Sequence, residues 1–387
     1  MAQDMSWWKH LKLRSKDPQV RLRTLETFDL AEVPDPKGLA LVIDSLTDED
    51  TQVRCAAAKV LGASKDPAAA EWLVPLLSSD CGPLRQAAAE ALGQLGNAES
   101  IEALKQMMQS PNPQDRASAG SALRALGWVP AAPEEQALYE VAIGNTRAAA
   151  LRGEAALDPL VSELHHDTSF ARRSAAEALE GVKDPRRIQP LIAAVNDQDP
   201  TVQVSAIHAL SDADGPLVQN TLLRRLSHHE ACVRQAAAEV LAKRDDPDLV
   251  PHFLGLLQDP SFEVRLAVVK YLGRFAHPQI TQGLLLLLSD KDSDVRLAAT
   301  KALGSSGDPV AIEGLVLALV DEERTIRQAA EGALDQINPC WPHCEASQRA
   351  ATRLEASLDS APPWVRSATV QLLAKLRAAS EQIQTVP

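Results

Sequence analysis

The densest group of reactive side chains in this 387-residue chain is Cys340-Trp341-Pro342-His343-Cys344. Two thiolates and an imidazole could bind zinc, or one thiol could carry a covalently attached group. A fourth zinc ligand is not evident, and the spacing does not match a familiar zinc motif. Cys340, His343 and Cys344 are therefore a candidate metal or thiol site. The alternative is a turn that opens a helix.

Motifs that would support other chemistry do not occur in the sequence. There is no Gly-rich phosphate loop, no nucleophile elbow and no recurring pair of acids. Cys55 and Cys232 stand at or beside small-residue helix positions, which favours packing over a nucleophilic role. The sequence therefore predicts no catalytic residue and no cofactor, and it favours a protein that is not an enzyme.

The composition limits the class of protein further. Aromatic residues make up only 3% of the chain, so alanine, leucine and valine must form the core, and alanine and leucine favour helices. The formal net charge of -13 disfavours a surface that binds nucleic acid. Five cysteines at irregular spacing indicate a reducing compartment. Neither a secretory signal nor an apolar run of membrane-spanning length occurs. We expect a cytoplasmic, all-α protein.

One motif recurs along the chain and predicts the fold. A turn precedes Val-Arg and an alanine-rich helix that ends in leucine and often glycine, as in VRCAAAKVLG from Val53 and VRLAATKALG from Val295. Its arginine recurs mostly every 31 residues, with one gap of 56. Repeats of this length stack into solenoids. The motif arginines are Arg21, Arg54, Arg85, Arg116, Arg172, Arg234, Arg265, Arg296, Arg327 and Arg366, with Gln203 at one position.

Each repeat contains a second helix before the arginine-bearing one. Asp-Pro opens this helix at five places, because aspartate caps the first amides of a helix and proline has no amide hydrogen to satisfy. A repeat is therefore helix A, a short acidic turn and helix B. The Asp-Pro pairs are Asp35-Pro36, Asp66-Pro67, Asp184-Pro185, Asp246-Pro247 and Asp308-Pro309.

The motif resembles that of HEAT-repeat α-solenoids, and more narrowly the short, alanine-rich repeats named after the phycobilisome bilin lyases. The resemblance covers about residues 10–377 and implies an armadillo-like α-α superhelix of about eleven two-helix repeats. It also implies that the motif arginine pairs with the aspartate of the preceding turn in a ladder between neighbouring repeats. The ladder arginines are Arg54, Arg85, Arg116, Arg172, Arg234, Arg265, Arg296 and Arg327.

The gap of 56 residues is one repeat plus 25 residues, and it divides the array. We predict an N-terminal lobe of four repeats (1–127), an insertion or hinge (128–152), a C-terminal lobe of seven repeats (153–377) and a tail (378–387). The insertion is either a filler helix or a contact element. In the second case Tyr139 is a candidate partner-binding residue.

Stacking of the repeats would create two surfaces. The acidic turns would align along one edge, where they cap helix B or attract a basic partner. The position five residues after each arginine would line the concave face, and its residues mix both charges without an aromatic. A groove for single-stranded nucleic acid is basic and carries stacking aromatics. The sequence therefore predicts no nucleic-acid partner.

Two leucines depart from the pattern of the other repeats. Leu266 and Leu297 follow their motif arginines at a position where other repeats carry glutamine. With Lys270 and Lys301 beside them, they would form an apolar spot flanked by cations, which suits an acidic amphipathic segment. The alternative is that neighbouring helices cover the leucines. These four residues are the candidate partner-binding site.

Two histidine pairs, His165-His166 and His228-His229, occupy equivalent turns two repeats apart. That separation is roughly 20 Å, which is too far for one metal ion to bridge. Dinuclear-iron HEAT hydroxylases resemble this fold but carry several His-Glu pairs, whereas this chain has one, His229-Glu230. The sequence disfavours that activity.

The sequence favours a protein–protein interaction scaffold or adaptor with an unidentified partner protein. The alternative is a phycobilin lyase-type chromophore-attachment or chaperone subunit, in which a thiol of the Cys340–Cys344 cluster could hold a bilin. A further alternative is peripheral membrane contact through Trp7 and Trp8, because tryptophan beside lysine suits a membrane interface. The same segment could equally cap the end of the solenoid.

Overall fold

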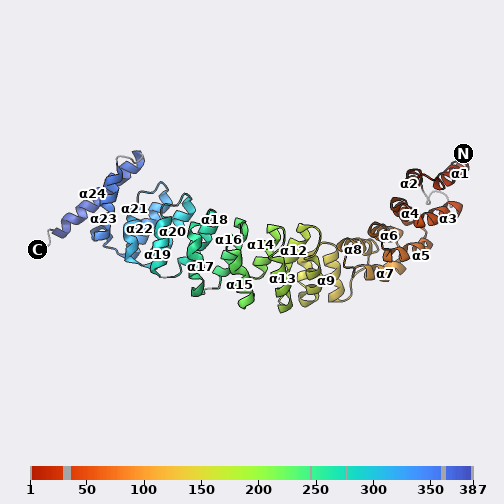
Figure 1. The fold of residues 1–387 in the computed structure, drawn as a ribbon, viewed down its shortest axis with the longest axis horizontal. Coiled ribbons are helices and arrows are strands. Elements are labelled where there is room, and N and C mark those ends of the chain that lie inside the picture. The colour runs from red at the N-terminus through yellow and green to blue at the C-terminus, as the bar shows by residue number, and fades with distance from the viewer. Residues whose placement is uncertain (1, 29–35, 245, 276, 359–362, 385–387) are drawn as a thin grey trace. The chain divides into compact units, whose positions relative to one another are not determined.

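The computed structural model describes residues 2–28, 36–244, 246–275, 277–358 and 363–384, and their regular structure is helical throughout (Figure 1). Helix A of a repeat packs against its helix B, and successive helices B pack against one another. The predicted all-α solenoid is confirmed. Asp35, the predicted cap before Pro36, and residues 385–387 of the predicted tail lie outside the described residues.

The chain divides into two compact units, Met1–Ala194 and Val195–Pro387. The predicted lobes, 1–127 and 153–377, do not coincide with these units, and their boundaries stay a prediction. The first unit contains α1 (Ala2–Leu13), α2 (Pro18–Glu26), α3 (Pro36–Asp44), α4 (Thr51–Ala63), α5 (Ala70–Leu73), α6 (Gly82–Leu95), α7 (Ile101–Met107), α8 (Pro113–Ala125), α9 (Pro133–Ala142), α10 (Thr146–Ala150), α11 (Leu157–Glu163), α12 (Ser169–Leu179) and α13 (Ile188–Ala194).

The second unit continues the same alternation of helices A and B. It contains α14 (Pro200–Ala209), α15 (Pro216–Arg225), α16 (Ala231–Ala242), α17 (Val250–Leu254), α18 (Phe262–Leu272), α19 (Pro278–Leu287), α20 (Ser293–Ser306), α21 (Ile312–Ala318), α22 (Arg324–Ile337), α23 (Glu345–Ser357) and α24 (Pro363–Gln384). The last helix therefore runs past residue 377, into the predicted tail.

Aspartate side chains begin helix A where the sequence places Asp-Pro. Asp66 accepts a hydrogen bond from the Ala68 amide at 3.0 Å, and Asp308 accepts one from the Val310 amide at 3.0 Å. Asp184 and Asp246 make the same contact. In each case the helix opens as a short 3-10 turn. These caps satisfy amides that have no acceptor within the helix.

The turn before helix B uses two aspartates in different ways. Asp50 accepts hydrogen bonds from two first-turn amides and so caps α4. Two residues earlier, Asp48 accepts the amide of Asp50 at 2.9 Å and also faces the preceding repeat. The same arrangement recurs at Asp290 and Asp292 before α20. The acidic turn therefore fixes the start of helix B and offers a carboxylate to its neighbour.

Small residues allow successive helices B to pack closely. A Cβ atom added to Gly62 of α4 would lie 2.6 Å from the Cα of Ala91 in α6. A Cβ added to Gly304 of α20 would lie 2.7 Å from the Cβ of Ala333 in α22. No side chain fits at such distances, so the glycine that ends the motif is required by the approach of the next helix.

Residues 128–152 form a short helix pair, α9 and α10. The first helix packs against α8 and the second against α12. Arg147 stands 31 residues after Arg116, at the start of α10, so the repeat period continues through this segment with a shortened helix B. The role of the segment as a hinge or contact element stays a prediction.

Candidate functional site

The motif arginines form ion pairs that join one repeat to the next. Arg234 donates from Nε and Nη2 to the two oxygens of Asp259, both at 2.7 Å, and Arg265 contacts Asp290 in the same way. Bidentate pairs of this kind fix both distance and orientation. The pairs of this arginine ladder are Arg21–Asp48, Arg85–Asp115, Arg116–Glu163, Arg234–Asp259, Arg265–Asp290 and Arg296–Asp321.

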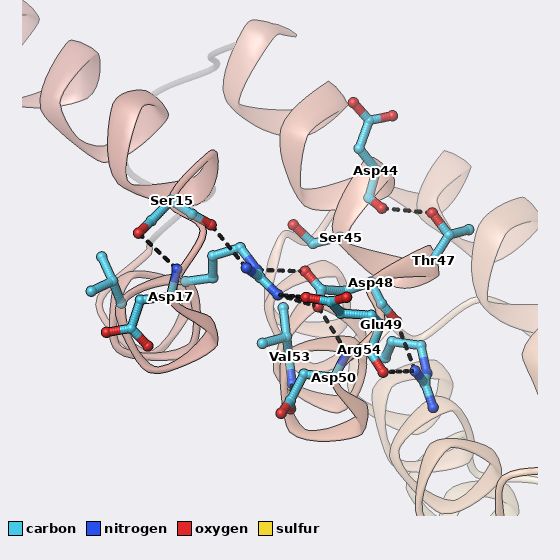
Figure 2. Close-up of polar contacts among 12 residues, drawn as sticks. Ser15, Asp17, Asp44, Ser45, Thr47, Asp48, Glu49, Asp50, Val53 and Arg54 are labelled. Carbon is cyan, nitrogen blue, oxygen red and sulfur yellow. Dashed lines mark hydrogen bonds and ion pairs between the residues drawn. The ribbon is translucent and has the colours of Figure 1, made fainter.

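The carboxylate of each pair belongs to the repeat that follows the arginine, which corrects the expectation that it lies in the preceding turn. The preceding turn contributes backbone instead: Arg54 donates from Nη1 to the carbonyls of Asp48 and Glu49 at 2.7 and 3.1 Å (Figure 2). Its aspartate is already held by the arginine of the previous repeat. Arg172 and Arg327 also donate to the carbonyls of their own turns.

The ladder favours the ionised form of two of its carboxylates, Asp48 and Asp290. Burial raises the pKa of Asp48 and Asp290, but hydrogen bonds from Arg21 and Arg265 and from their own turns outweigh it, so the net shift lowers each pKa. The pKa of each partner arginine is raised by the same hydrogen bonds. These aspartates serve the solenoid itself, so part of the acidic edge predicted from the turns is occupied within the chain.

The four residues predicted to bind a partner lie around one groove. Leu266 and Lys270 of α18 and Leu297 and Lys301 of α20 line a space of about 480 Å³ between these helices. Both leucines are half-buried, and both lysines are exposed. We call this space the α18–α20 groove.

The depth of the α18–α20 groove comes from small residues. Gly273, Ala298 and Ala302 also line it. A Cβ added to Gly273 would lie 2.7 Å from the Cβ of Ala302, so the end of α18 closely approaches α20. Leu297 packs in part against the buried cluster that contains Ile326. Neighbouring helices therefore cover part of this leucine, and the rest faces the groove.

Cations outnumber carboxylates around the groove. Lys270, Arg274 and Lys301 line it, against one acidic residue, Asp294. Among the residues that the structure describes, neither lysine has a carboxylate partner. The chain as a whole carries a formal net charge of -13. The groove is therefore a locally cationic, apolar-floored site on an acidic protein.

A second groove adjoins the first on the other side of Leu266 and Lys270. It measures about 540 Å³ and lies between α16 and α18, where Glu239 and Lys243 line it. It contributes two carboxylates, Glu239 and Glu263, as well as cations. Leu266 and Lys270 therefore face both spaces.

The sequence analysis missed Arg274, which lines both grooves, and Tyr271, which lines the groove between α16 and α18. Tyr271 is buried, its hydroxyl donates to the Asp246 carbonyl at 2.6 Å, and its ring stacks on Phe253 with 4.3 Å between centroids. The Arg274 guanidinium lies 4.9 Å from the centroid of the Tyr271 ring. The sequence contains a weak indication of the role of Arg274, because Arg244 stands about one repeat earlier. Each of these two arginines donates to a backbone carbonyl of the preceding repeat.

Tyr139 belongs to the first unit, whereas the other four candidate residues belong to the second. It lies on α9, half-buried, with its ring edge-on to Trp128 at a centroid distance of 5.6 Å. Both aromatic rings pack against the core of the first unit. Its role in partner binding stays a prediction.

The Cys340–Cys344 segment forms a turn that opens α23. Trp341 is buried and donates from Nε1 to Asp335 at 3.0 Å. Cys340 is exposed, and the sulfur of half-buried Cys344 lies 3.3 Å from the Ser347 hydroxyl oxygen. The turn starts at Trp341 and includes His343. The metal or thiol role of this segment stays a prediction.

The histidine pairs replace aspartate in two turns. His166 accepts the amide of Thr168 at 3.0 Å through Nδ1, and His228 accepts that of Glu230 at 3.2 Å. This is the contact that Asp48 makes in its own turn. In the part of the chain that the structure describes, no three His, Cys, Asp or Glu side chains are grouped so as to hold a metal ion.

The N-terminal helix α1 packs against α2 and α3. Trp8 is exposed, and the Lys12 ammonium lies 4.0 Å from the centroid of its ring. The side chain of Trp7 lies outside the described residues. Membrane contact through this segment stays a prediction. Within the described residues, no helix is long and apolar enough to cross a bilayer.

Solved structures resemble this chain at low identity. An engineered protein is 22% identical, over 85% of this chain and 98% of that chain, with a TM-score of 0.41. Human deoxyhypusine hydroxylase in complex with glycerol is 22% identical, over 86% and 95% of the chains, with a TM-score of 0.28. A mutant of Kap121p is 14% identical, over 97% and 46%, with a TM-score of 0.39. Likeness at this level carries no argument about function.

Family comparison agrees with the repeated helix pairs. No curated protein matches the chain. The narrower resemblance to bilin-lyase repeats stays a prediction. A family model described as HEAT repeats matches residues 9–84, 41–124, 131–211, 157–242, 188–262, 220–285, 250–335 and 281–374. These matches span most of the chain, so it belongs to the HEAT-repeat family.

Proposed function

We propose that this protein is a non-enzymatic adaptor that holds a partner protein by an acidic amphipathic segment in the α18–α20 groove. The observation that carries the proposal is the combination of half-buried Leu266 and Leu297 with the exposed Lys270 and Lys301. On a chain of net charge -13, a cationic rim around an apolar floor selects for a ligand of opposite charge.

The two leucines supply the affinity in this proposal. Burying one leucine fully at an interface is worth about 1.5–3 kcal/mol relative to leaving it exposed. Each leucine here is already half-buried, so the gain lies toward the lower end of that range. Loss of both should still weaken binding about tenfold or more, because about 1.4 kcal/mol corresponds to one factor of ten.

In this proposal the lysines orient the bound segment and raise the rate of its association. Their ammonium groups stand at the rim, exposed to solvent, where charge pairs steer association more than they add affinity. A helical segment with aliphatic residues at positions i and i+4 and carboxylates on both flanks satisfies the floor and the rim together. Nothing in the described residues favours the chromophore-attachment alternative over this function.

Selection from a random peptide library displayed on phage, with the full chain as bait, tests the proposal. We expect the selected peptides to be acidic, with aliphatic residues at helical spacing. Their affinity, measured by fluorescence anisotropy, should fall about tenfold or more for L266Q/L297Q. The melting temperature of this variant should stay close to that of the unmodified chain, because glutamine occupies the equivalent position in other repeats.

A matched control comes from the first unit. Lys59 lies on α4, five residues after Arg54, as Lys270 and Lys301 follow their own arginines. K59E should leave the selected peptides bound with unchanged affinity. Selection of basic peptides, or unchanged affinity in L266Q/L297Q, would overturn the proposed function.

A further inference from the structure

The two helices of the α18–α20 groove carry the same order of side chains. Each has a carboxylate, a leucine three residues later and a lysine four residues after the leucine. Residues with this spacing lie on one face of a helix. No other repeat combines an acid, a leucine and a lysine at these positions. The two sets are Glu263, Leu266 and Lys270 on α18, and Asp294, Leu297 and Lys301 on α20.

The two sets lie side by side in the same direction. Gly273 directly follows α18, and a Cβ added to it would lie 2.7 Å from the Cβ of Ala302, in the later half of α20. Leu266 and Leu297, nearer the starts of the same helices, line one groove. The helices α18 and α20 therefore run parallel, with equivalent residues at the same level.

The groove consequently has a negative end and a positive end. Asp294 lines it in the first turn of α20, and Glu263 stands at the same level of α18, where it lines the adjoining groove. Lys270 and Lys301 line the groove seven residues further along their helices. This separation is about 10 Å along the helix axis. Arg274 adds a third cation at the lysine end. All five residues are exposed, so a ligand that enters the groove meets both ends.

A helical ligand has a preferred direction on such a surface. The partial charges at helix termini favour acidic residues in its first turn and basic residues in its last turn. An acidic first turn pairs with the lysine end, and a basic residue about two turns later then reaches the level of Asp294. The opposite direction would bring the acidic turn against Asp294 and Glu263.

Given an acidic amphipathic segment in the α18–α20 groove, as the proposed function requires, we infer that it is a helix antiparallel to α18 and α20. Its acidic N-terminal turn lies over Lys270 and Lys301, and a basic residue about two turns later lies over Asp294. The leucines do not select this direction, because burial of apolar surface is non-directional. Asp294 therefore distinguishes this segment from one that is acidic throughout.

Photo-crosslinking with a designed peptide tests the direction. The probe is a capped, alanine-based helix of about 16 residues, long enough to be partly helical on its own. It carries glutamates in its first turn, two central leucines four residues apart, and one lysine about two turns after the glutamates. A benzophenone amino acid stands at its N-terminal or its C-terminal end. The full chain is irradiated with each probe and digested with trypsin. Because trypsin cuts after Arg265, Lys270, Arg296 and Lys301, the two ends of the groove fall in different fragments.

The two probes should label opposite ends of the groove. We expect the N-terminal probe to label residues 271–274 and the fragment that begins at Ala302, and the C-terminal probe to label the fragments that end at Arg265 and Arg296. The exchanged pattern, or equal labelling of both ends by each probe, would overturn the inferred direction and leave the groove as the binding site. Labelling confined to helices outside the groove, or labelling that persists in L266Q/L297Q, would overturn the proposed function itself.

A charge exchange at Asp294 gives a second readout. By fluorescence anisotropy, the unmodified chain should prefer the probe's lysine over glutamate at that position by about threefold, and D294K should reverse the preference. T325K is the matched control, because exposed Thr325 occupies the equivalent position on α22, outside the groove. It should keep the preference of the unmodified chain. A preference that D294K leaves unchanged would refute the role of Asp294.

Discussion

Arg116 of α8 forms a buried ion pair with Glu163 at the end of α11, 47 residues further along the chain. In the other ladder pairs the two residues stand 25–30 residues apart. The longer separation spans α9 and α10, whose own motif arginine, Arg147, is exposed. Arg116 therefore reaches past the short helix pair to the carboxylate of the next full repeat, and the ladder continues across it.

Replacing Arg116 by alanine should destabilise the first unit strongly. The change leaves the Glu163 carboxylate buried without its partner, and loss of one member of a buried pair costs about 3–5 kcal/mol. R147A is the matched control, since exposed Arg147 should change stability by no more than about 0.5 kcal/mol. Urea denaturation followed by circular dichroism measures both. Equal losses from the two variants would contradict the bridging role of Arg116.

Adding a methyl group to Gly62 should separate two helices B. The new Cβ would lie 2.6 Å from the Ala91 Cα, and overpacking of this kind costs about 1–3 kcal/mol. Gly332 of α22 is the control, because a Cβ there meets nothing within 4 Å and alanine is a better helix former by about 1 kcal/mol. Calorimetry should show a lower melting temperature for G62A and a higher one for G332A. A higher melting temperature for both variants would contradict the close packing of α4 against α6.

The ladder should make stability depend on acid. Because the folded-state pKa of Asp48 and Asp290 lies below the unfolded value of 3.8, their contribution is complete above that value and is lost as the pH falls through the folded pKa. The melting temperature should therefore be nearly independent of pH just above about pH 5 and should fall below about pH 4. D48N/D290N should be less stable at neutral pH and should lose less on acidification. An unchanged acid profile in this variant would refute the assignment.

Charge at the α18–α20 groove should control binding of the selected acidic peptides. K270E/K301E reverses both rim charges and should abolish measurable binding, while the affinity of the unmodified chain should fall as salt is added. Stability should barely change, because neither lysine has a carboxylate partner among the described residues. Affinity that is insensitive to both salt and charge reversal would contradict the proposed role of the two lysines in peptide binding.

The sequence predicted those features that depend on period and on local capping. The 31-residue spacing places Leu266 beside Leu297, because equal steps bring equivalent positions of two helices B together. Caps such as Asp66 and Asp308 follow from contacts between residues two apart, which sequence displays directly.

Features that depend on contacts between repeats were harder to predict. The direction of the ladder was wrong, because a pattern shows which residues recur but not which neighbour each side chain reaches. The pairing of Arg116 with Glu163 spans a shortened repeat, so the period gives no hint of it.

Radical footprinting of leucine side chains tests the central claim most directly. The full chain is oxidised by hydroxyl radicals with and without a selected acidic peptide, and each leucine is read by mass spectrometry. Leu266 and Leu297 should be protected by the peptide, whereas Leu286 of α19, 67% exposed and outside the groove, should oxidise equally in both samples. Protection of Leu286 with no change at Leu266 and Leu297 would contradict the assignment of the α18–α20 groove as the binding site.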